Sequence, residues 1–158
     1  MEFDFLQKNF PDCKVILKDV GCGTFAEVYA SDETEPVKVF LEDIDHQPYT
    51  VCFSYQHVHC FNEEEAVEWT KSFLSGERSA IEFFIGDKPC VGGDIESIAP
   101  ENFTTEYFKT CPFAQFILSK PIPENLNFKV RSVLKKFCFD GYFEKTAKNF
   151  TVIIDPLT

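Results

Sequence analysis

The fold class follows first from CKVILKDVGCGTFAEVYA, residues 13–30. Residues 13–20 and 24–30 are rich in β-branched and aromatic side chains, and residues 24–30 alternate between apolar and polar positions, as strands do. Gly21 and Gly23 stand between the two segments. Glycine has no Cβ, so it adopts the backbone conformations that a tight chain reversal requires. The stretch therefore predicts a β-hairpin near the N-terminus.

Further strand patterns follow along the chain. They lie at residues 37–41, 49–60, 79–85, 90–97 and 151–155. Residues 49–60 form the longest of them, and the short spacing between strands in the first half is typical of hairpins. The pair Gly92-Gly93 indicates a β-bulge or a close backbone contact. Runs of strands with few helices between them favour an α+β fold over a doubly wound parallel sheet.

Two longer helices are expected, at residues 63–75 and 128–139. Asn62 is suited to cap the first, Glu65 stands three positions later, and Gly76 follows its last turn. The second is predicted from an apolar stripe at helical spacing. Shorter helical turns are expected at residues 3–10 and 104–110. We therefore expect an α+β fold: a largely antiparallel β-sheet with two main helices packed on it.

The chain length suits a single domain. A chain of 158 residues with 44% hydrophobic residues, nineteen of its residues being Phe, can bury a sizeable core. Residues 1–158 are accordingly expected to form a single domain. Prolines interrupt residues 99–127, so this segment is expected to be an irregular connection, with a possible strand at 113–118.

The charge excludes some partners and favours others. The formal net charge is −11, which disfavours nucleic acid and anionic lipid, because both are held by Lys and Arg. No apolar run approaches the length of a membrane span. Residues 1–106 carry 22 acidic and seven basic residues, whereas residues 107–158 carry four and eight. An acidic surface of this kind favours a basic protein as partner.

The cysteines and the N-terminal sequence favour the cytoplasm. The chain has seven cysteines, an odd number, scattered singly and without a CxxC pair. Such usage is unlike the disulfide framework of a small secreted domain. MEFDFLQKNF, at the start, has no basic segment followed by an apolar one, so a signal peptide is not expected.

Two histidines suggest an alternative chemistry. His57 and His59 share one face of a regular strand, where two imidazoles can contribute to a metal site or serve a thiol nucleophile. In an unbroken strand over residues 49–60, Cys52 and Cys60 would lie on the opposite face. Two ligands do not make a site, so the leading hypothesis includes no metal and no cofactor.

A resemblance to a known class is carried by four segments. They are residues 53–61, 65–74, 81–84 and 92–95, which read FSYQHVHCF, EAVEWTKSFL, IEFF and GGDI. Together these segments, under a third of the chain, resemble small bacterial immunity proteins of polymorphic toxin systems. The resemblance implies a cytoplasmic, non-enzymatic protein that binds a toxin and blocks it.

The leading hypothesis is therefore a cytoplasmic binding protein of the immunity type, which covers a basic toxin with an acidic face. The residues expected to make this contact lie in two clusters: Asp32, Glu33, Glu35, Glu42, Asp43 and Asp45. One alternative is a small metal- or thiol-dependent enzyme that uses His57, His59 and a cysteine. Another is an adaptor or structural domain.

Overall fold

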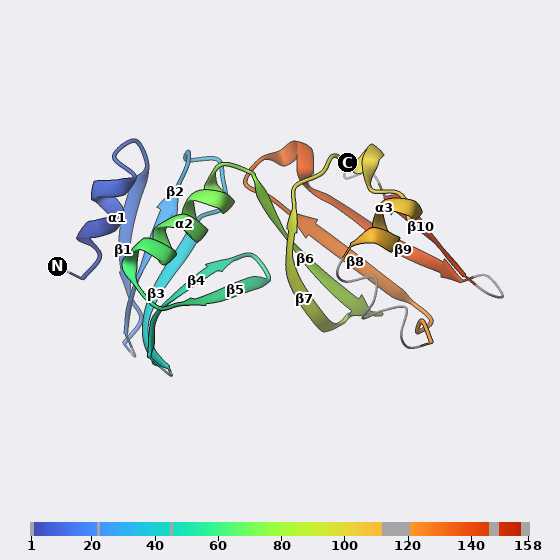
Figure 1. Ribbon diagram of the computed structural model, residues 1–158, viewed down its shortest axis with the longest axis horizontal. Helices are drawn as coiled ribbons and strands as arrows, with labels where there is room; N and C mark the ends of the chain where they lie inside the picture. Colours follow the sequence, from blue (N-terminus) through green and yellow to red (C-terminus); the bar gives the residue numbers. More distant parts are fainter. Residues whose placement is uncertain (1, 22, 45, 112–120, 146–148, 156–158) are drawn as a thin grey trace.

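A computed structural model describes residues 2–21, 23–44, 46–111, 121–145 and 149–155. Its strands form two five-stranded antiparallel sheets (Figure 1). Sheet A has the order β1 (Lys14–Asp19), β2 (Thr24–Tyr29), β3 (Val37–Ile44), β4 (Gln47–Phe53), β5 (Gln56–Cys60). Sheet B has the order β10 (Phe150–Asp155), β9 (Phe139–Lys145), β8 (Leu126–Arg131), β6 (Arg78–Ile85), β7 (Lys88–Glu96). The α+β class and the antiparallel pairing are confirmed.

Sheet A is a meander in which each strand pairs with the next one along the chain. The expected hairpin at residues 13–30 is β1 and β2, in which Leu17 lies opposite Ala26. The expected single strand at residues 49–60 is instead a second hairpin, β4 and β5. Ser54 has a φ of 50° and reverses the chain there. The expectation was wrong because both arms have strand composition and no glycine marks the turn between them.

Helix α2 (Glu63–Leu74) confirms the expected helix at residues 63–75. The Asn62 side chain accepts a hydrogen bond from the backbone N–H of Glu65 at 2.8 Å, which satisfies one free donor of the first turn. The Glu65 carboxylate accepts in turn from the N–H of Phe61 at 3.2 Å. Gly76 has a φ of 78° after the last turn, and this left-handed conformation suits glycine.

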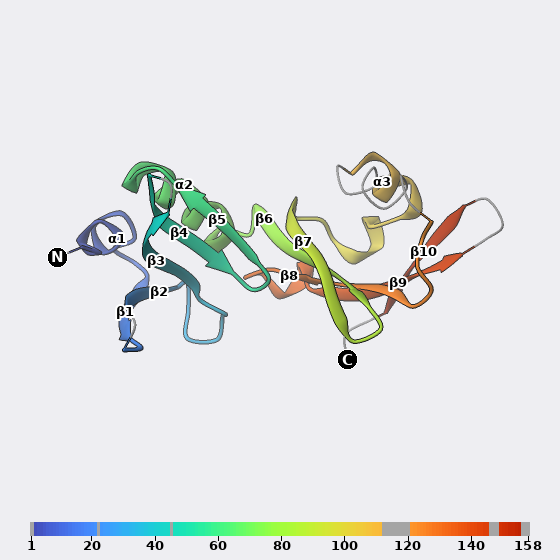
Figure 2. The ribbon, with the colours of Figure 1, turned by 90° about the horizontal axis from the view of Figure 1, so that it is seen from below.

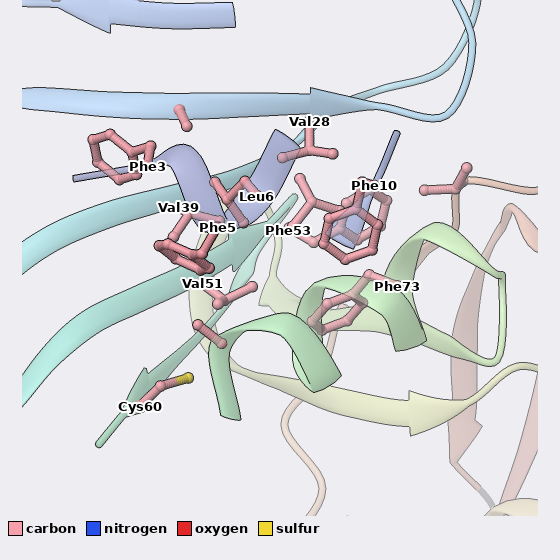
Figure 3. Close-up of a cluster of buried hydrophobic side chains, with 14 of the residues drawn as sticks. Phe3, Phe5, Leu6, Phe10, Val28, Val39, Val51, Phe53, Cys60 and Phe73 are labelled. Atoms are coloured by element: carbon pink, nitrogen blue, oxygen red, sulfur yellow. The ribbon is translucent and has the colours of Figure 1, made fainter. Parts of the chain in front are cut away.

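The core of sheet A lies between the strands and two helices. Helix α1 (Asp4–Asn9) and α2 cover the same face, and Figure 3 shows their side chains meeting those of the strands in one cluster. Phe53 of β4 stacks on Phe73 of α2 with ring centroids 5.4 Å apart. The valines of β2, β3 and β4 fill most of the remaining space: Val28, Val37, Val39 and Val51.

The core of sheet B is made chiefly of phenylalanine rings. They are Phe83, Phe103, Phe108, Phe128, Phe139, Phe143 and Phe150. Helix α3 (Thr105–Thr110) and the short 3₁₀ helix η1 (Pro100–Asn102) lie in the expected irregular connection and deliver two of these rings. The expected strand at 113–118 lies outside the described residues. In Figure 2, α1 and α2 lie above sheet A and α3 lies above sheet B, so the opposite faces of both sheets carry no helix among the described residues.

The expected helix at residues 128–139 is wrong. Residues 126–131 form β8, with Leu126, Phe128 and Val130 buried at every second position. A single 3₁₀ turn, η2 (Lys135–Phe137), follows, and β9 begins at Phe139. Pairing of β8 with β6 and β9 on either side buries this alternating set, which outweighs a helical stripe of marginal propensity. Among the helices of the described residues only α2 is therefore longer than six residues, so two main helices were one too many.

The two sheets touch through the β4–β5 hairpin and the start of β6. Tyr55 at the hairpin tip meets Phe84 of β6 edge-on, with ring centroids 5.9 Å apart. Arg78 forms an ion pair with Asp94 of β7 and lies over the ring of Trp69 of α2, 5.8 Å from its centroid. An added Cβ at Gly92 would lie 3.1 Å from the carbonyl oxygen of Ile81, so the expected close backbone approach is confirmed there. Strand β7 also has a bulge near this glycine: Phe83 of β6 pairs with Val91 and Phe84 pairs with Pro89, so one residue of β7 between them is extra.

Candidate functional site

The net charge of the protein belongs to one of its two sheets. Residues 1–77, which build sheet A, α1 and α2, contain sixteen acidic and five basic residues. Residues 78–158, which build sheet B and α3, contain ten of each. The sheet A half (residues 1–77) thus carries the whole charge of −11, and the sheet B half (residues 78–158) is neutral. A binding site for a charged partner is to be sought on the sheet A half.

The structure does not bring the two expected acidic clusters together. Asp32, Glu33 and Glu35 lie in the loop between β2 and β3, whereas Glu42 and Asp43 lie at the far end of β3. A strand rises by about 3.3 Å per residue, which places the clusters about 20 Å apart. Asp45 is outside the described residues. The five described residues of this set therefore lie at opposite ends of sheet A and do not form one continuous patch.

The loop cluster is partly compensated by basic residues. Asp32 lies 3.8 Å from the Lys14 ammonium, but both side chains are exposed, and such a pair contributes little. Desolvation raises the pKa of the Glu35 carboxyl, and the positive charges of Lys38 and Arg131 oppose that rise. Since Arg131 belongs to sheet B, Glu35 lies close to the junction of the two sheets. All three carboxylates of this loop are exposed, and Glu35 is the one that faces the junction.

Glu42 is held in a hydrogen-bonded chain on the helix-free face of sheet A. The Thr50 hydroxyl donates to the Glu42 carboxylate at 2.8 Å and lies 2.9 Å from Nδ1 of His59. A hydroxyl has one hydrogen, so Nδ1 of His59 must be the donor to the Thr50 oxygen. Thr50 is only 4% exposed. Glu42 of β3 is therefore linked through Thr50 of β4 to His59 of β5. These hydrogen bonds hold its carboxylate in place and limit its availability to a partner.

Cys52 lies on the same face as the two histidines, contrary to the expectation from one long strand. It is directly opposite His57 in the β4–β5 register, as Thr50 is opposite His59. The turn at Ser54 is the physical reason, because paired residues of a hairpin share a face. The rings of His57 and His59 are 5.2 Å apart. Cys60 is buried on the other face, within the core of sheet A.

The thiols near these histidines are poor nucleophiles at neutral pH. Burial raises the pKa of Cys52 to about 11, with a further rise from the Glu42 charge and an opposing effect of Lys38. Burial, assisted by the Glu65 charge, raises the pKa of Cys60 to about 12. Nucleophilic catalysis needs a thiolate. The part of the chain that the structure describes also holds no group of three or more His, Cys, Asp or Glu side chains arranged to hold a metal ion.

A second acidic region, with an exposed aromatic ring, lies around the start of α2. Phe61 is 60% exposed and is followed by Glu63, Glu64 and Glu68 on the solvent side of the helix. The Tyr49 hydroxyl donates to the Glu63 carboxylate at 3.3 Å. We call these four residues, Phe61, Glu63, Glu64 and Glu68, the α2 patch.

The α2 patch lies at the same end of sheet A as Glu42 and Asp43. Tyr49 of β4 pairs with Leu41 of β3 on one side and with Cys60 of β5 on the other, so the end of β3 and the residue preceding Phe61 lie at the same level of the sheet, with β4 between them. The acidic run at residues 63–68 is visible in the sequence. Sequence reasoning assigned it to stabilisation of the helix N-terminus and did not include it in the binding site. The exposure of Phe61 had no local signal, because most of the phenylalanines are buried.

Comparison with known proteins identifies no relative. No family model, no curated protein and no solved structure matches this chain. No helix among the described residues is long and apolar enough to cross a membrane. The fold and the surface define the class: an α+β protein of two antiparallel sheets, acidic on one sheet and neutral on the other.

Proposed function

We propose that this protein is a non-enzymatic binding protein whose partner is a basic protein. The observation that carries the proposal is the confinement of the net charge of −11 to the sheet A half. A one-sided charge orients a diffusing partner before contact and raises the association rate, whereas an even distribution would only aid solubility. The resemblance to immunity proteins supports a toxin as the partner and the cytoplasm as the place of action.

The α2 patch and the β2–β3 loop are the two contact regions of the proposed interface. Aromatic side chains anchor protein interfaces, and Phe61 is the most exposed of the large apolar side chains described. Glu64 and Glu68 are one helical turn apart beside it, so one basic segment can meet both. Asp32 and Glu33 supply negative charge at the other end of sheet A. A partner that touches both regions would have to cover much of this half.

An enzyme is the second candidate. One observation favours it: Cys52, His57 and His59 share a face, and His59 is oriented through Thr50 by Glu42. The raised pKa of Cys52 opposes it, because the thiol stays protonated where most enzymes act. Binding is therefore the function that the surface supports better.

Three double charge reversals test the proposal. Asp32→Lys with Glu33→Lys changes the loop, and Glu64→Lys with Glu68→Lys changes the α2 patch. Asp87→Lys with Glu124→Lys makes the same change of charge on exposed residues of the sheet B half. The immobilised proteins are exposed to a lysate of the source cells, and bound proteins are eluted with rising salt.

We expect the unmodified protein and the sheet B variant to retain one basic protein at stoichiometric level up to the same salt concentration. The α2 patch variant, the loop variant or both should release it at lower salt, because complementary charges are screened less at low ionic strength. Equal loss in all three variants would mean that net charge alone acts. Unchanged retention in all three would contradict the electrostatic proposal.

A further inference from the structure

The outer edge of β1 differs from the three other sheet edges. Unpaired edges invite further strands, and proteins usually protect them. At β10, the Val152 N–H donates to the Thr105 hydroxyl of α3 at 3.0 Å. At β7, Pro89 lacks an N–H and a bulge follows it. Strand β5 has only five residues and lies against β6 and β7.

The hydrogen-bonding pattern of β1 shows which of its backbone groups point outward. The Val20 N–H donates to the Gly23 carbonyl at 3.1 Å across the β1–β2 turn. Hydrogen-bonded and non-hydrogen-bonded pairs alternate along an antiparallel ladder. With the observed register, the backbone groups of Val15, Leu17 and Asp19 therefore face away from β2. No hydrogen bond to these three N–H or C=O groups occurs among the described residues.

The side chains of this edge leave it open to an added strand. Lysines commonly protect edges, but Lys14 and Lys18 point to the face opposite Leu17, because side chains alternate along the strand. Their charges are also balanced by the carboxylates of Asp32 and Glu27, each 3.8 Å away. Leu17 is 42% exposed and Val20 is 59% exposed, so apolar surface accompanies the free backbone groups. A strand beside β1 would cover Leu17 and form hydrogen bonds with the outward N–H and C=O groups of Val15, Leu17 and Asp19.

We propose that an extended basic segment of the partner protein adds to sheet A as a sixth strand beside β1. The inference rests on the proposed function and names the contact it would use. The charge selects the occupant: the sheet A half is acidic, so a segment with lysine or arginine is attracted to it. A second copy of this chain is disfavoured, because pairing β1 with β1 would bring together two halves of charge −11.

The pleat of β1 defines the side chains of that segment. Leu17 and Asp19 point to the same face, two residues apart. The segment should carry an apolar side chain opposite Leu17 and a basic one near Asp19. The basic side chain would meet a carboxylate that already accepts from the Gly21 N–H at 2.9 Å.

The test uses the full chain and a short synthetic peptide in which valine and threonine alternate between terminal lysines. A matched peptide is N-methylated at alternate residues, which removes the donors of one edge. Binding is followed by amide chemical shifts, and we expect shifts confined to β1 and its turn. Shifts confined to other elements, equal affinity for the methylated peptide, or no binding at millimolar concentration would overturn the proposal.

Two variants of Leu17 make the test specific. Leu17→Pro removes an outward N–H without breaking the β1–β2 ladder and should lower the affinity for the peptide about tenfold. Leu17→Ala keeps the N–H and should lower it only about threefold. Intact shifts for β2 and β3 show that Leu17→Pro is folded. Unchanged affinity of a folded Leu17→Pro variant would overturn the assignment.

The edge and the proposed function can fail separately. A peptide with glutamate in place of both lysines should bind more weakly. If it binds β1 equally well, the basic partner is wrong although the edge is used. If Leu17→Pro captures a basic protein from lysate as strongly as the unmodified chain, the function stands and the added strand is wrong.

Discussion

The two sheets have the same number of strands and are both antiparallel, but different kinds of side chain form their cores. The core of sheet A is largely aliphatic and is closed by the amphipathic helix α2. The core of sheet B is a network of phenylalanine rings, for example Phe108 and Phe143 at 5.0 Å and Phe103 and Phe139 at 5.1 Å. The net charge of −11 lies on the sheet A half, and the sheet B half has a net charge of zero.

The difference indicates that sheet B contributes chiefly to stability and sheet A chiefly to recognition of a partner. Aromatic rings bury much apolar area each and lose little rotamer freedom, so a sheet with only a short helix over it can still be stable. Sheet A has the longer helix, whose solvent side can carry acidic residues without loss of core. Stability of the second sheet and recognition by the first are then separable properties, and this can be tested.

The largest effect is expected from Phe128→Ala. Phe128 is fully buried and contacts the rings of Phe83, Phe103, Phe139 and Phe143. Loss of a buried Phe costs about 4 kcal/mol of the free energy of unfolding. Urea unfolding measures this loss, with the exposed Phe61→Ala as control, which should change stability by less than about 0.5 kcal/mol. If both halves unfold together, near-ultraviolet and helical signals will move to the same lower midpoint; separate midpoints would show that the sheets unfold independently.

Gly141→Ala should cause the second largest loss of stability, because the Phe128 ring packs against Gly141 of β9 where a Cβ would lie. An added Cβ would lie 2.4 Å from the ring of Phe128 and 2.6 Å from the carbonyl oxygen of Ile153. Such overpacking costs about 3 kcal/mol. Gly23→Ala is the matched control, because no atom lies within 4 Å of its added Cβ and its φ is not positive. Equal stability of the two variants in thermal unfolding would show that β9 can move away from β8.

Alkaline pH should weaken the sheet A half through its buried thiols. The pKa of Cys60 is raised to about 12 in the folded protein, from an ordinary value of 9.0. The folded state therefore favours the protonated thiol, and the resulting stability is complete below about pH 9 and is lost as the pH rises toward 12. The slope approaches about 1.4 kcal/mol per pH unit. Cys60→Ala should reduce this slope between pH 9 and 11, and an unchanged slope in that variant would contradict the prediction.

The smallest effect is expected at the cap of α2. Asn62→Ala removes the acceptor for the Glu65 N–H and should cost about 1 kcal/mol. Asn62→Asp keeps an acceptor and should remain near the stability of the unmodified protein. Circular dichroism during thermal unfolding measures both. A destabilised Asn62→Asp variant would indicate that the acidic side chains of the first turn, rather than the cap, limit this helix.

Local patterns predicted most of sheet A and α2. The alternation at residues 24–30, the glycine turn before it and the capping set at Asn62 are short-range features, and the structure contains all three. Sheet B was harder to predict, because β8 has an apolar spacing compatible with two periods. The pairing of β8 with β6, more than forty residues earlier, decided between them.

The candidate site divides in the same way. Acidic clusters and histidines can be read from a sequence, but their faces depend on where the chain reverses. The turn at Ser54 placed Cys52 beside His57, and the direction of β3 separated the loop acids from Glu42. The exposed Phe61 also emerged only from the fold, because nothing in its neighbours distinguishes it from a buried ring.

The sequence by itself determined the α+β class, the first hairpin, the capped helix α2 and the net charge, because propensities, turns, caps and charges act over a few residues. Only the tertiary structure decided that the chain makes two sheets, that the charged half and the neutral half each build one of them, and that no described residue pairs with the outer edge of β1. These depend on pairing between distant strands, whose free energy comes from burial that a local pattern does not contain.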